Sequence, residues 1–185
     1  WQHKGRHNVS NALAAAALAE TVGISLERSG AALRDFRGVK RRLELLGCIG
    51  GVSIYHDFAH HPTAIEATLQ GLRATAAGGR IVAVIEPRSN TMRLGVHRER
   101  LPGCTRDADL VLWFQPHGVD WDIESVARAS ATPSRVYQST AVIVDALVEE
   151  LRPGDQVVIM SNGGFEGIHR RLLLALESSV AARAG

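Results

Sequence analysis

The sequence predicts an α/β fold in which a doubly wound, mostly parallel sheet is joined to an N-terminal helical arm and a short β-hairpin. Three observations support this prediction. Apolar runs of strand length recur along the chain, helix-length segments separate them, and Gly50-Gly51 stands between two strand-like segments. Continuous apolar runs are typical of strands buried on both faces, and strands that alternate with helices form parallel sheets.

The helical arm is predicted from the first part of the chain. Alanine-rich "ALAAAALAE", followed by Gly23 as a stop, predicts a helix over about residues 9–22. Apolar residues at helical spacing in "SLERSGAALRDF", with Ser25 as N-cap, predict a second helix over about 26–36. Two strands then flank the Gly50-Gly51 turn, and the second covers residues 52–58.

The rest of the chain alternates regularly between helices and strands. The expected elements are a helix after Pro62, a strand at 80–86, a helix near 97–107, a strand at 110–114, a helix from about 122, a strand at 135–138, a helix at about 140–151, a strand at 156–161 and a helix from about 165.

Composition excludes several classes of protein. The 185 residues are 45% hydrophobic and 22% charged, as in ordinary globular domains, and the net charge of +2 with scattered basic residues argues against nonspecific nucleic-acid binding. Cys48 and Cys104 lack CxxC spacing, and the sequence contains neither a membrane-length apolar run nor a signal-peptide pattern. We therefore expect a cytoplasmic protein, and because the chain opens on Trp1 we expect a fragment.

Polar clusters follow the predicted strands at the ends where ligands gather in such sheets. They are 57–61, 86–97, 114–120 and 161–167. The carboxyl ends of parallel strands meet at one edge, so these clusters are expected to share it.

The first cluster is "DFAHHP". Asp57 could accept two hydrogen bonds from a ribose diol, or it could cap the helix that begins at Pro62, and the two interpretations are about equally favoured. His60 and His61 at a helix N-terminus could meet phosphate or carboxylate groups. They do not form a metal motif, because adjacent side chains diverge.

The second cluster could bind a charged, peptide-like ligand, and the last could bind an anion. "EPRSNTM" offers Arg88, Ser89, Asn90 and Thr91, although Arg88 could instead pair with Glu86. "SNGGFEG" places Asn162 and Gly163 between a strand and a helix, where the glycines could serve an anion or only a tight turn. The sequence has neither a GxxxxGK[ST] phosphate-binding loop nor a GxSxG nucleophile motif.

Read together, "GRHNVSNALAA", "GVKRRLE", "YHDFAHHPTAI" and "EPRSNTMRLGVH" resemble the Mur ligase superfamily. The resemblance implies that residues 1–40 are the tail and linker of a central ATPase domain, and that residues 41–185 are the Rossmann-like C-terminal domain. The missing phosphate-binding loop would then lie in the central domain. A hinge near residues 38–44 is also expected.

The resemblance implies a role for each site residue. Asn11 would contact adenine, Asp57 would hold the ribose and Arg42 would reach the ATP phosphates. Arg42, His60 and His61 would form the catalytic set. The peptide would be bound by Arg88, Ser89, Asn90, Thr91, Asn162 and Gly163.

The implied reaction is ATP-dependent joining of the murein tripeptide L-alanyl-γ-D-glutamyl-meso-diaminopimelate to UDP-N-acetylmuramate through an acyl phosphate, in peptidoglycan recycling. The implied cofactors are ATP and Mg²⁺, with the metal held mainly by the absent central domain, and the partners are the two substrates and the rest of the chain. The fragment alone would be inactive. Alternatives are addition of L-alanine to UDP-N-acetylmuramate, or a non-catalytic Rossmann-like module that binds a nucleotide or peptide.

Overall fold

The computed structural model describes residues 5–76, 78–119 and 121–184. Its helices and strands follow one another as α1 (Arg6–Thr21), α2 (Leu26–Asp35), β1 (Glu44–Ile49), β2 (Val52–Asp57), α3 (Pro62–Arg73), β3 (Ile81–Ile85), α4 (Asn90–Arg93), η1 (Gly103–Thr105), β4 (Leu110–Phe114), α5 (Ile123–Ala129), β5 (Ser134–Tyr137), α6 (Thr140–Glu150), β6 (Gln156–Met160), η2 (Phe165–Gly167) and α7 (Ile168–Ala184).

One six-stranded sheet forms the body, with strand order β1-β2-β6-β3-β4-β5. β1 pairs antiparallel with β2, and every other pairing is parallel. β6, the last strand in the sequence, is inserted between β2 and β3. The predicted α/β class, with its doubly wound sheet, hairpin and helical arm, is confirmed.

The core consists of two apolar layers, one on each face of the sheet. In β3, Ile81, Ala83 and Ile85 belong to the layer under α3 and α5, whereas Val82 and Val84 belong to the layer under α6 and α7. Successive side chains of a strand point to opposite faces. Both faces are covered, so the strand is apolar at every position.

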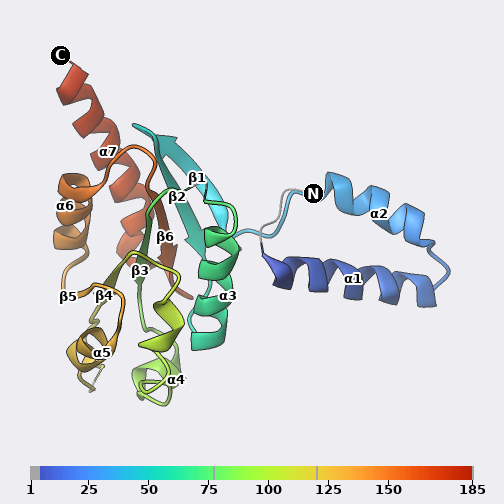
Figure 1. Cartoon of the computed structure of the whole chain (residues 1–185), viewed down its shortest axis with the longest axis horizontal. Coiled ribbons are helices and arrows are strands. Elements are labelled where there is room, and N and C mark those ends of the chain that lie inside the picture. Colours follow the sequence, from blue (N-terminus) through green and yellow to red (C-terminus); the bar gives the residue numbers. More distant parts are fainter. Residues whose placement is uncertain (1–4, 77, 120, 185) are drawn as a thin grey trace.

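The helical arm projects from this body (Figure 1). No residue of α1 is buried, and in α2 only Ser29 is buried. Leu13 and Leu18 of α1 are 66% and 68% exposed. The arm therefore presents apolar side chains that the described part of the chain does not cover.

The prediction of a helix near residues 97–107 is wrong. α4 ends at Arg93, turns follow, and only the short η1 at Gly103–Thr105 is helical. Gly95 has φ +68, a left-handed conformation that interrupts an α-helix, and Pro102 lacks the amide N–H that a continuing helix needs. None of the helices in the described ranges is long and apolar enough to span a bilayer.

Candidate functional site

Three of the predicted polar clusters lie at one rim because of the strand register. Asp57 of β2 is the partner of Met160 of β6, and Met160 is also the partner of Ile85 of β3. The chain leaves the sheet directly after these residues, with Ser161 N donating to Asp57 O at 3.1 Å and Glu86 N to Met160 O at 3.0 Å. The loops that contain 57–61, 86–97 and 161–167 therefore start side by side.

The fourth cluster adjoins this rim after β4. Arg93 Nη2 donates to Gly118 O at 3.4 Å, and Trp121 Nε1 donates to Met92 O at 2.8 Å. These bonds join the loops that follow β3 and β4. Asp120 lies outside the described residues.

Asp57 is a buried carboxylate, 4% exposed, and it already has several protein partners. Its Oδ2 accepts from Leu43 N at 2.7 Å, and its Oδ1 accepts from Ala59 N at 2.7 Å and from Thr68 Oγ1 at 3.3 Å. A carboxylate offers about four acceptor positions, so these bonds leave room for about one more donor. A single ribose hydroxyl fits this arrangement better than both hydroxyls of a diol.

The helix that begins at Pro62 is capped by His61, not by Asp57. His61 Nδ1 accepts from Thr63 N at 3.3 Å, and Pro62 occupies the first turn, where its missing N–H costs nothing. The expectation that Asp57 could be the cap is therefore wrong. Asp57 instead holds the linker through Leu43 and the turn through Ala59.

His60 and His61 have different environments. His60 Nδ1 lies 2.9 Å from Phe58 O, and its ring meets the Phe58 ring edge-on. The His61 ring lies 4.3 Å from the His97 ring, centroid to centroid. Burial first, and then the positive charges of His97, Arg100 and His60, lower the pKa of His61 below its usual value.

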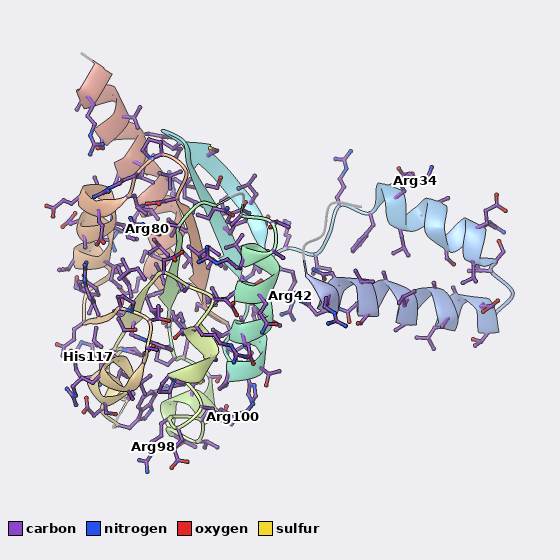
Figure 2. The ribbon with its side chains drawn as sticks, in the orientation of Figure 1. Arg34, Arg42, Arg80, Arg98, Arg100 and His117 are labelled. Carbon is purple, nitrogen blue, oxygen red and sulfur yellow. The ribbon has the colours of Figure 1, made fainter. Side chains whose placement is uncertain are left out.

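A cavity of about 760 Å³ opens between the arm and the body. Asn11, Arg42, Asp57 and His61 all line it. Figure 2 shows Arg42 on the side of the body that faces the arm. The three residues predicted to bind the nucleotide thus share one cavity, although Asn11 lies 46 residues before Asp57 in the sequence.

The residues predicted to bind the peptide lie on the neighbouring loops, outside this cavity. Arg88 is exposed, and its side chain lies directly over Gly163, because a Cβ built on Gly163 would be 2.3 Å from Arg88 Nη1. Ser89 Oγ and Thr91 Oγ1 lie 3.4 Å apart at the start of α4, where Asn90 is the first residue. The loops after β3 and β6 are therefore in contact through Arg88 and Gly163.

Glu86 does not pair with Arg88. It is 4% exposed and accepts from Ser161 Oγ, which itself accepts from Gly163 N at 2.9 Å. The Arg88 guanidinium is thereby left at the surface of the rim. Asn162 Oδ1 is buried and has no hydrogen-bond partner among the described atoms.

Arg41 also reaches this rim, although the run Lys40-Arg41-Arg42 does not distinguish it from Arg42. Its guanidinium donates to Ser161 O and Gly163 O. No local pattern in the sequence signals this role. The described residues bring together no group of three or more His, Cys, Asp or Glu side chains that could hold a metal ion.

Comparison with known proteins shows a matching family model and several similar relatives. The family model "Mur ligase, glutamate ligase domain" matches residues 41–163. The UDP-N-acetylmuramate--L-alanyl-gamma-D-glutamyl-meso-2,6-diaminoheptandioate ligase of Escherichia coli is 43% identical over 183 residues, covering 98% of this chain and 40% of that protein. A UDP-N-acetylmuramate--L-alanine ligase of Pelotomaculum thermopropionicum is 37% identical over 169 residues, covering 86% of this chain and 36% of that protein.

This chain is also similar to a solved structure. The murein peptide ligase of Psychrobacter arcticus superposes with a TM-score of 0.76 at 44% identity, covering 96% of this chain and 38% of that one. The chain spans about two fifths of the length of the curated tripeptide ligases that it matches.

Proposed function

The chain belongs to the Mur ligase family, and from that premise we propose that it is the C-terminal part of an ATP-dependent, ADP-forming amide-bond ligase. The full-length protein would join the tripeptide L-alanyl-γ-D-glutamyl-meso-diaminopimelate to UDP-N-acetylmuramate in the cytoplasm, in peptidoglycan recycling. One observation carries the proposal: Asn11, Arg42 and Asp57 line one cavity beside the rim on which Arg88 and Asn162 lie.

In the proposed reaction, the γ-phosphoryl group of ATP passes to the carboxylate of UDP-N-acetylmuramate, giving an acyl phosphate and ADP. The amino group of the tripeptide attacks the acyl carbon, phosphate leaves, and the nitrogen loses a proton. The residues of this chain act by positioning and by charge. Asn11 would contact adenine, Asp57 one ribose hydroxyl and Arg42 the phosphates, since a guanidinium suits developing phosphoryl charge.

The histidines and the loop residues would act on the other substrate. His61 caps α3 and His60 directly precedes it, at the helix N-terminus where the phosphate and the incoming amine would meet. Arg88 would bind a carboxylate of the tripeptide, with Ser89, Asn90, Thr91, Asn162 and Gly163 lining the rest of the pocket. Mg²⁺ would be held mainly by the central domain.

We assign residues 1–40 to the tail of the central ATPase domain and its linker, and residues 41–185 to the C-terminal domain. Two observations support this division. The family model begins to match at residue 41, and the exposed apolar residues of α1, including Leu13 and Leu18, would be covered by the remainder of a central domain. The linker at residues 38–44 would then be the hinge at which the domains close over ATP.

The relatives favour the tripeptide over L-alanine as the amine substrate. The Escherichia coli tripeptide ligase is 43% identical to this chain, whereas the L-alanine ligase of Pelotomaculum thermopropionicum is 37% identical over a shorter match. An assay with each of the two amines tests this preference directly.

That test uses the full-length gene product, including the residues that precede Trp1. ADP release is measured with ATP and UDP-N-acetylmuramate, and with either the tripeptide or L-alanine as amine. We expect release to require the tripeptide. Release with L-alanine alone would establish the alternative ligase, and no release with either amine, together with ATP binding, would leave a non-catalytic module.

Two variants of the full-length protein and the isolated 185-residue fragment provide further tests in the same assay. R42Q should lower kcat at least about tenfold, because a charge-assisted contact to phosphate contributes about 1.5–3 kcal/mol. R135Q is the matched control, since Arg135 of β5 is also exposed but pairs with Glu150 of α6, away from the cavity. The 185-residue chain alone should show no turnover, and measurable turnover would refute the division into domains.

A further inference from the structure

Arg41 and Arg42 are adjacent, but their side chains have different surroundings. Arg42 is exposed and lines the cavity. Arg41 turns into the body: its Nε donates to His56 Nε2 at 3.2 Å, and its Nη2 donates to Ser161 O at 2.9 Å and to Gly163 O at 2.8 Å. Its guanidinium carbon also lies 4.7 Å from the centre of the Phe58 ring. One side chain thus joins the linker, β2 and the turn after β6.

The two carbonyls that Arg41 binds belong to the turn on which Arg88 rests. Gly163 has no side chain, and the Arg88 guanidinium occupies the space that a Cβ would fill. Displacement of Gly163 therefore displaces Arg88. The main chain of Arg41 is held separately, because its N–H donates to Glu44 Oε2 at 2.8 Å and its carbonyl accepts from Phe58 N at 2.8 Å.

Strained backbone occurs in the linker and in η2, which begins shortly after the turn that Arg41 binds. Arg41 and Leu43 have φ values of +62 and +49, and Phe165 and Glu166 have values of +44 and +48. Side chains other than glycine disfavour this region, and it persists only where surrounding contacts enforce it. Two of the hydrogen bonds that the Arg41 guanidinium donates, to Ser161 O and Gly163 O, supply such contacts between the linker and the turn.

We propose that Arg41 is a positioning residue that fixes the turn at residues 161–163 against the linker, and thereby places Arg88 and Asn162 for the amine substrate. This inference rests on the proposed ligase function. The two neighbouring arginines have different roles. Arg42 would contact the ATP phosphates, whereas Arg41 holds the peptide pocket in place without contacting the peptide. The nucleotide cavity is attached through main-chain bonds of the linker, so it does not depend on the Arg41 guanidinium.

The kinetic test uses the full-length ligase with R41Q and R41K. R41Q should raise the KM for tripeptide about tenfold or more, because it removes charge-assisted hydrogen bonds to two carbonyls, and should leave the KM for ATP within about twofold. R41K keeps the charge but lacks the planar fork, so its KM for tripeptide should be intermediate. An equal rise in both KM values, or a rise for ATP alone, would overturn the proposal.

R73Q is the matched control. Arg73 also donates to two main-chain carbonyls, those of Asp107 and Gly79, both at 3.2 Å, but it lies at the other end of α3 from the rim. R73Q should leave both KM values unchanged. If it raised the KM for tripeptide as R41Q does, the effect would be a general loss of stability and the proposal would fail.

A second measurement separates this inference from the proposed function. Amide hydrogen exchange over residues 161–164 should be faster in R41Q than in the wild type and unchanged in R73Q. This result is expected whether or not the protein ligates the tripeptide. Unchanged exchange in R41Q would overturn the positioning role even if the wild type is an active ligase.

Discussion

Replacement of Asp57 by Asn should destabilise the protein and weaken nucleotide binding together. Asp57 is 4% exposed, and its two oxygens accept from Leu43 N and Ala59 N, both at 2.7 Å. An asparagine has only one oxygen, so its NH₂ group must face one of these two N–H donors. One charge-assisted bond is lost and the other loses its charge, which together cost about 2–4 kcal/mol.

Urea denaturation of the 185-residue chain measures this cost. With a urea dependence of about 2 kcal/mol/M, the midpoint should fall by about 1–2 M. In the full-length protein, the affinity for an ATP analogue should also fall, because the Leu43 N–Asp57 bond holds the linker beside Arg42. A midpoint within about 0.2 M of the wild type would refute the structural role assigned to Asp57, since that change is smaller than any buried charged hydrogen bond should produce.

D155N is the control for the binding part of this prediction. Asp155 is 5% exposed and accepts from Arg152 N at 2.9 Å and from Arg80 Nη2 at 2.8 Å. It precedes β6, at the opposite edge of the sheet from Asp57. D155N should lower the urea midpoint by a similar amount and leave the affinity for the ATP analogue unchanged.

Three further changes test the rim and the helices beneath it. S161A should destabilise the chain by about 1–3 kcal/mol in urea denaturation, because it leaves the buried Glu86 carboxylate without its hydroxyl donor; an unchanged midpoint would contradict this pairing. G163A should displace Arg88 and raise the KM for tripeptide in the full-length ligase with little loss of stability, since a Cβ there would be 2.3 Å from Arg88 Nη1; an unchanged KM would show that Arg88 does not need this position. H169L should reduce the acid sensitivity of folding. Burial first, and then the charges of His56 and Arg41, lower the pKa of His169 to about 4 from 6.5. Between these two values the unfolded chain binds the proton more readily, so stability falls as pH falls through this window, by up to roughly 3 kcal/mol. The difference between urea midpoints at about pH 7 and about pH 5 should therefore be smaller in H169L than in the wild type, and an equal difference would contradict the assignment.

The sequence was sufficient to predict the layers of this fold but not the order of its strands. Apolar runs such as Ile81–Ile85 report burial on both faces, and the structure agrees. An apolar run does not indicate which other strands will pair with it. No local feature of the sequence therefore predicted that β6 lies between β2 and β3. The helix expected near 97–107 failed for a related reason. The regular alternation of helices and strands favoured it, but Gly95 and Pro102 favour turns, and turns are what the chain adopts there.

The candidate site was predictable where its residue types are distinctive. Asp57 ends β2, His61 and Arg88 follow β2 and β3, and the structure places all three at the predicted edge. The partners of Asp57 could not be predicted, because two of them are main-chain N–H groups, those of Leu43 and Ala59. The contrast between Arg41 and Arg42 was equally hidden, because it depends on the backbone conformation of the linker and not on the type of side chain.

The central position of β6 has a consequence for how the chain acquires its structure. Until residues 156–160 have been synthesised, β2 has only β1 as a neighbour, and the hairpin has no edge of β3 to join. The sheet must then accept its last strand between two segments that are already made. Pairings so distant in sequence are slow to form. Nascent chains that end before residue 156 would therefore hold two separate half-sheets with open edges, which makes this stage of synthesis the one most exposed to aggregation.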